Sequence, residues 1–121
     1  RLMRMPWSVN AFAIEAYHYL LDHKDDYHIN KNHLHDEAVG MSQAFRRLGI
    51  KCQDTDCNFI LCRLPEGNVS QLKAWLMDRY GLLIRDASNF ETLDKTYFRV
   101  AAQDHESNEL LIKCIEEWMS F

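Results

Sequence analysis

Two arginines occupy positions from which their side chains could bind an anion. Arg85 ends a short apolar run that begins at Leu82, and Arg99 lies inside another run between Tyr97 and Ala101. Because side chains alternate along a strand, each arginine lies on the face opposite its preceding apolar neighbour. A guanidinium presents a planar fork of donors that suits a carboxylate or a phosphate. The alternative is a structural ion pair with a nearby Asp or Glu, since an unpaired buried charge is costly.

Histidines and cysteines are numerous, but their spacing argues against a metal site. Two ligands on one helix face are four residues apart, whereas four of the histidines recur every five residues: His18, His23, His28 and His33. Three cysteines recur in the same way and lack the C-x-x-C spacing of zinc sites: Cys52, Cys57 and Cys62. We therefore expect no metal ligands and reduced thiols. A metal-binding domain built from these residues is the weakest alternative.

Composition and motifs exclude several classes of function. The sequence contains no Gly-x-Ser-x-Gly elbow, phosphate loop or Gly-x-Gly-x-x-Gly pattern, so we expect no catalytic residue. The 14 basic side chains are outnumbered by 18 acidic ones, which argues against binding to nucleic acid. No apolar run approaches the roughly 20 residues that span a bilayer. With no secretory segment either, we expect a cytoplasmic protein that does not bind membranes.

Apolar periodicity predicts an α+β fold. Helices are expected over residues 11–23, 32–48 and about 69–80, and a last helix after the cap Asp104. Strands are expected over residues 58–64, 82–85 and 96–101. The first helix would start at the cap Asn10 and bury a stripe of Phe12, Ala16, Tyr19 and Leu20. A small, mostly antiparallel sheet with helices packed on one face buries one apolar side of every element.

The two arginines also belong to longer sequence patterns. Ile-Arg-x-x-x-Asn-Phe ends at Phe90, Tyr-Phe-Arg-Val ends at Val100, and Asn-Glu-Leu-Leu ends at Leu111. Together with Pro-Trp-Ser-Val-Asn ending at Asn10, they resemble the closing part of threonine-phosphate decarboxylases. They are similar, though less so, to histidinol-phosphate aminotransferases. The resemblance spans nearly the whole chain but is faint between about residues 25 and 57.

The resemblance implies the C-terminal small domain of a fold-type-I pyridoxal-phosphate enzyme. Residues 1–10 would be the linker from a missing large domain, and residues 11–121 the small domain, of the aminotransferase type. Arg1 stands where an initiator methionine would be, which also leads us to expect a fragment. None of the six lysines lies in the family's Schiff-base context, so the chain alone should be inactive. Pyridoxal phosphate would be bound by the large domain, through which the parent would also form a homodimer.

The resemblance also assigns substrate-binding residues. Arg99 matches the arginine that receives the substrate carboxylate, and Arg85 a second arginine for the substrate's anionic end, commonly a phosphate. Asn89, beside Arg85, is a weaker candidate for shaping the site. The substrate would be an amino-acid phosphate or an amino acid, and details of the motifs favour the decarboxylase branch, which serves cobalamin biosynthesis. The alternative from another class is a stand-alone α+β module that binds a small anion or has a regulatory role.

Overall fold

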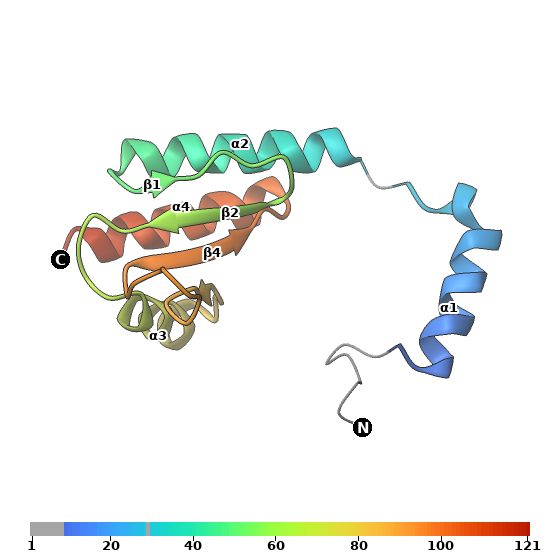
Figure 1. The fold of residues 1–121 in the computed structure, drawn as a ribbon. Coiled ribbons are helices and arrows are strands. Elements are labelled where there is room, and N and C mark those ends of the chain that lie inside the picture. Colours follow the sequence, from blue (N-terminus) through green and yellow to red (C-terminus); the bar gives the residue numbers. More distant parts are fainter. Residues whose placement is uncertain (1–8, 29) are drawn as a thin grey trace, which may run out of the picture. The chain divides into compact units, whose positions relative to one another are not determined.

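The chain folds into two compact units. The computed structural model describes residues 9–28 and 30–121 (Figure 1). The smaller unit extends to Asn30 and contains helix α1 (Ala11–Asp22) and the short 3-10 helix η1 (Lys24–Asp26), and the larger unit comprises Lys31–Phe121. Most of the linker predicted over residues 1–10 lies outside the described residues, so this boundary stays a prediction.

Helix α1 is correctly predicted, but its burial is not. The Asn10 side chain accepts a hydrogen bond of 2.9 Å from the Ala13 N–H, which confirms the cap. The predicted stripe is wrong: α1 has no buried residue, and Phe12 is 87% exposed. An apolar helix face is buried only against a second packed element, and η1 is the one other helix among the described residues of this unit.

The larger unit is built on a small antiparallel sheet with strand order β1-β2-β4-β3. Its elements are α2 (Lys31–Arg47), β1 (Lys51–Cys52), β2 (Phe59–Arg63), α3 (Val69–Tyr80), β3 (Arg85–Asp86), β4 (Tyr97–Ala101) and α4 (His105–Met119). This confirms the α+β class and the interior position of the strand expected over residues 58–64. Within the described ranges, no helix is long and apolar enough to cross a membrane.

Helices cover one face of this sheet. Alternate residues of the two central strands are buried, namely Ile60, Cys62, Phe98 and Val100. They share a core with apolar side chains of α2, α3 and α4, among them Phe45, Leu72 and Ile115. The rings of Phe45 and Phe98 meet edge to face at 6.2 Å. The intervening residues of β2 and β4 lie on the opposite face, here called the open face, and these include Phe59, Arg63 and Arg99, all of them exposed.

Two details of the sheet differ from the expectation. The strand predicted over residues 82–85 pairs only at Arg85–Asp86. The chain is still leaving α3 before that point: Gly81 has φ +65°, and the Leu82 N–H bonds to the Leu76 carbonyl at 3.2 Å. Strand β1 was not predicted, because two residues give no detectable alternation.

Candidate functional site

The two arginines expected to bind an anion are direct neighbours across the sheet. Arg85 of β3 is the cross-strand partner of Arg99 of β4. Both side chains are exposed. Neither makes an ion pair with an acidic side chain anywhere in residues 9–28 and 30–121. The alternative of a structural ion pair is therefore not realised in this part of the chain, and two adjacent positive charges are left for another anion.

An aromatic ring positions one of these arginines. The Arg99 guanidinium carbon lies 4.7 Å from the centroid of the Phe59 ring, on the neighbouring strand β2. A guanidinium stacked on an aromatic face keeps its N–H edge free for a carboxylate or phosphate. Arg63 lies over Tyr97 at 5.5 Å, but it also contacts Asp94, with 3.8 Å between Nη2 and Oδ2. Arg99 is therefore oriented without being neutralised, whereas Arg63 is partly neutralised.

A cavity of about 500 Å³ lies beside the arginine pair. Its lining includes Arg85, Arg99 and a third cation, Lys73 of α3, and no acidic side chain. Apolar side chains supply much of the remaining wall, among them Phe59, Leu83, Ile84 and Leu111. Positive charge against a wall of low polarity favours an anion, because electrostatic attraction is stronger where water is partly excluded.

Asn89 does not join this cluster. It lies exposed in the turn that follows β3 and is not among the residues that line the cavity. The polar residue that shapes this turn is Asp86, which accepts hydrogen bonds from the Ser88 N–H at 2.9 Å and the Ser70 hydroxyl at 2.7 Å. These bonds from Ser88 and Ser70 lower the pKa of Asp86 and tie β3 to the first turn of α3. A site-shaping role for Asn89 stays a prediction.

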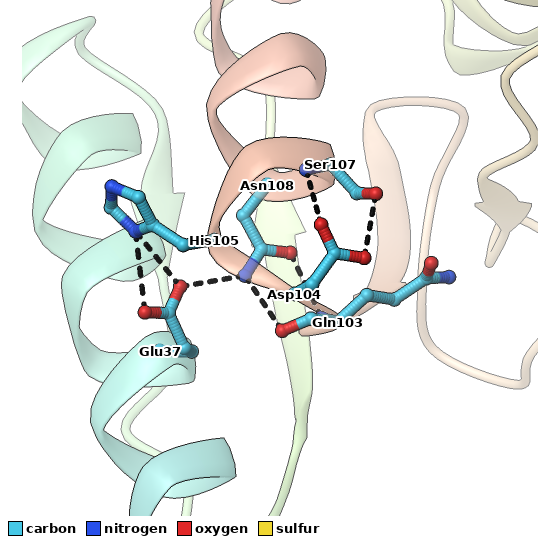
Figure 2. A network of polar contacts seen from close by, with 6 residues as sticks. All are labelled: Glu37, Gln103, Asp104, His105, Ser107 and Asn108. Atoms are coloured by element: carbon cyan, nitrogen blue, oxygen red, sulfur yellow. Dashed lines mark hydrogen bonds and ion pairs between the residues drawn. The ribbon is translucent and has the colours of Figure 1, made fainter.

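The buried amide of Asn108 forms another part of the cavity wall. Figure 2 shows the hydrogen bonds that hold it. The Asn108 side chain donates to the Glu37 carboxylate at 2.8 Å and to the Gln103 carbonyl at 3.1 Å, and it accepts from the Gln103 N–H at 2.9 Å. The hydrogen bond from Asn108 is the main cause that lowers the pKa of Glu37, and His105 adds to it. Because its polar atoms are occupied, Asn108 acts here as a brace between α2, α4 and the end of β4.

Lys73 is the cation that sequence reasoning missed. It lies four residues after Val69 and one after Leu72, at the border of the buried face of α3. A lysine in that position can lay its stem along apolar surface and carry its charge to the rim. The sequence does show that Lys73 borders the apolar face of the helix. It does not show which strands that helix packs beside.

The residues of this cavity suit a small anion better than they suit pyridoxal phosphate. Pyridoxal phosphate needs a lysine and a partner for its ring nitrogen. The cavity has one lysine and no carboxylate, while its arginines are free for anionic groups. Among the residues that the structure describes, no group of three His, Cys, Asp or Glu side chains could hold a metal ion.

The chain is similar in sequence to about one third of two decarboxylases. A predicted threonine-phosphate decarboxylase of Caldanaerobacter subterraneus is 38% identical over 111 residues, which are 91% of this chain and 30% of that protein. The threonine-phosphate decarboxylase of Salmonella typhimurium is 29% identical over 116 residues, or 95% of this chain and 31% of that protein. The chain thus spans less than one third of the length of these curated relatives. No family model matches it.

Solved structures agree with the sequence comparison. The L-threonine-O-3-phosphate decarboxylase of Porphyromonas gingivalis superimposes with a TM-score of 0.88 and 35% identity, covering 99% of this chain and 37% of that one. A histidinol-phosphate aminotransferase of Clostridium acetobutylicum superimposes with a TM-score of 0.65 over 69% of this chain and 26% of that one. At 23% identity the second match shows the fold alone. The resemblance to threonine-phosphate decarboxylases and to the fold of histidinol-phosphate aminotransferases is confirmed.

Proposed function

We propose that this chain is the C-terminal small domain of a pyridoxal-phosphate-dependent enzyme, and that it closes over the substrate. The observation that carries the proposal is the Arg85–Arg99 pair, which faces a cavity without acidic side chains. In this role Arg99 receives the substrate carboxylate and Arg85 a second anionic group, a phosphate in the decarboxylase branch. The similarity to three threonine-phosphate decarboxylases supports that branch over the aminotransferases.

The chemistry itself belongs to the rest of the proposed parent enzyme. Pyridoxal phosphate, when bound there, acts as the electron sink for bond cleavage at the substrate's α-carbon. This chain binds and orients the anionic groups, and its apolar wall excludes water from the closed site. We therefore expect the chain alone to be inactive. We also expect the full-length parent to be a cytoplasmic homodimer.

One test is addition of pyridoxal phosphate to the chain alone. We expect no saturable, stoichiometric adduct at a single lysine, because the cavity offers no carboxylate for the ring nitrogen. Lys73 is the one lysine in the cavity, so Lys73→Ala is the matched variant. Absorbance of a one-to-one adduct that disappears in Lys73→Ala would contradict this assignment of roles.

The second candidate is a stand-alone module that binds a small anion. The three cations of the cavity support both candidates equally. The two candidates differ in how tightly the isolated chain should bind an anion. A closing domain supplies only part of a substrate site, and a charge-assisted hydrogen bond gives about 1.5–3 kcal/mol, so O-phosphothreonine should bind in the millimolar range. A complete module should bind its anion in the micromolar range or better. Titration of the chain with O-phosphothreonine and with inorganic phosphate, followed by NMR, separates the two.

A further inference from the structure

Two thiols face each other across the edge of the sheet farthest from the arginine pair. Cys52 of β1 is the direct cross-strand partner of Cys62 of β2, and their sulfur atoms are 3.5 Å apart. Both are free thiols. Cys62 is buried in the core, whereas Cys52 is partly exposed. The pair therefore combines the thiol of a partly exposed residue with a thiol inside the protein.

The strand pairing places these thiols at a separation that suits a disulfide. The Gln53 N–H donates to the Leu61 carbonyl directly opposite, at 3.0 Å. Hydrogen-bonded and non-hydrogen-bonded pairs alternate in an antiparallel ladder, so the adjacent pair Cys52 and Cys62 is non-hydrogen-bonded. The Cα atoms of such pairs are about 4.5 Å apart, inside the range of about 4.4–6.8 Å found for disulfides. Closure to a bond of about 2.05 Å requires only a small movement of each sulfur.

We propose that Cys52 and Cys62 are a redox-active dithiol that low-molecular-weight disulfides, such as oxidised glutathione, convert to a cross-strand disulfide. The Cys52 thiolate attacks one sulfur of the small disulfide, which forms a mixed disulfide and releases one small thiolate. That thiolate takes the proton of Cys62. The Cys62 sulfur then attacks the Cys52 sulfur and expels the second small thiolate, which takes up the proton that Cys52 gave to solvent. Two protein thiols are oxidised, and one small disulfide is reduced to two thiols.

Exposure and charge assign the order of attack. The hydrogen bond from Cys62 lowers the pKa of Cys52, and the nearby Arg46 lowers it further. The same hydrogen bond to Cys52, together with burial, raises the pKa of Cys62. Once Cys52 carries the small thiol, it no longer bears the negative charge that opposes ionisation of Cys62. The outer thiol therefore reacts first and the inner thiol resolves the mixed disulfide.

Oxidation would tie the edge of the sheet to its interior. Strand β1 is two residues long and forms one edge, and β2 carries Leu61 directly opposite Arg99. A covalent link at Cys52 closes the loop that leads back to Cys62 and so restricts the unfolded chain. We expect the oxidised chain to melt at a higher temperature than the reduced chain.

The test is equilibration of the full chain with oxidised and reduced glutathione, followed by acid quenching, alkylation and mass spectrometry. The four free thiols should fall to two, in a monomer whose peptide map links Cys52 to Cys62. Four remaining thiols under oxidising buffer would overturn the proposal. So would a stable mixed disulfide at Cys52 without a link, or a link that involves Cys57 or Cys114.

Three variants keep the test decisive. In Cys62→Ala, the reaction with oxidised glutathione should stop at the mixed disulfide on Cys52. Cys52→Ser should form no internal disulfide, and its melting temperature should not rise under oxidising conditions. If the core change at Cys62 impairs folding, Cys52→Ser at the partly exposed position still decides the question. Cys57→Ser is the matched control, because Cys57 is an exposed thiol outside the pair, and it should behave as the wild type.

Discussion

Arg85 and Arg99 lie directly opposite one another on adjacent strands, with no acidic partner among the described residues. Like charges in this position destabilise a sheet by a few tenths of a kcal/mol to about 1 kcal/mol. Replacing either arginine with an uncharged residue should therefore make the sheet more stable. The cost of this arrangement to the sheet supports the proposal that the two arginines hold anionic groups of a substrate.

Substitution of Arg85 should separate stability from binding. We expect Arg85→Gln to leave the free energy of unfolding unchanged or to raise it by up to about 1 kcal/mol, because the repulsion across the strands is relieved. The same change should weaken the binding of O-phosphothreonine. Thermal unfolding and NMR titration measure the two effects on one preparation. Arg63→Gln is the control on the same face: it removes the contact with Asp94 and should not be stabilising. A loss of stability above about 1 kcal/mol in Arg85→Gln would give that arginine a structural role.

The network around Glu37 should make stability depend on acid pH. Hydrogen bonds from Asn108 and His105 lower the pKa of Glu37 in the folded state. A lowered carboxyl pKa contributes stability that is fully present above the unfolded-state value, about 4.3, and is lost as the pH falls through the folded-state value. Between pH 6 and pH 3 the wild type should therefore lose more stability than Glu37→Gln. Melting curves over this interval test it, with the exposed Glu66→Gln as control; identical pH profiles for wild type and Glu37→Gln would contradict the linkage.

The turn after β2 should tolerate no side chain at Gly67. Its φ is +96°, and an added Cβ would lie 3.0 Å from Cη2 of Trp118. Strain of the backbone and this close contact should make Gly67→Ala destabilising by about 1–3 kcal/mol. Gly40→Ala in the middle of α2 is the matched control, because its Cβ meets no atom within 4 Å and alanine favours the helix by about 0.5–1 kcal/mol. Urea unfolding of both variants should give shifts of opposite sign.

Removal of residues 1–30 should leave the fold of the larger unit intact. The core of the larger unit is built from its own side chains, between Ala38 and Met119, while the exposed side chains of α1 include Phe12, Ile14 and Tyr17. A chain of residues 31–121 should therefore show the same melting temperature as the full chain and a weaker tendency to associate. Calorimetry and analytical ultracentrifugation check both. A fall in melting temperature of more than about 5 °C would mean that α1 stabilises the larger unit.

Local signals in the sequence predicted most of the elements. Asp104 caps α4, with its Oδ1 2.9 Å from the Ser107 N–H, and Gly81 ends α3 in the left-handed conformation. Alternation in Tyr97–Ala101 correctly put Phe98 and Arg99 on opposite faces, and the structure shows that the Phe98 face is the buried one. Such signals are local because a cap, a stop or an alternation is complete within a few residues.

The remaining features depend on which segments meet in space. Periodicity in α1 predicted burial of Phe12, but amphipathicity does not specify what covers a helix. The pairing of Arg85 with Arg99 depends on the register between β3 and β4, and Lys73 joins them only because α3 lies beside that edge. The register of β1 and β2, which brings Cys52 against Cys62, was equally invisible in the sequence.

The central proposal is that Arg99 binds the substrate of the proposed full-length parent enzyme, and steady-state kinetics of Arg99→Ala in that parent test it most directly. A charge-assisted contact in a closed site contributes on the order of 2–4 kcal/mol, so kcat/KM should fall by roughly 30- to 1,000-fold while the melting temperature stays close to that of the wild type. Arg99→Lys should recover only part of this, because an ammonium lacks the planar fork, and Arg63→Ala should leave kcat/KM unchanged. A value of kcat/KM for Arg99→Ala within about threefold of the wild type would contradict the account.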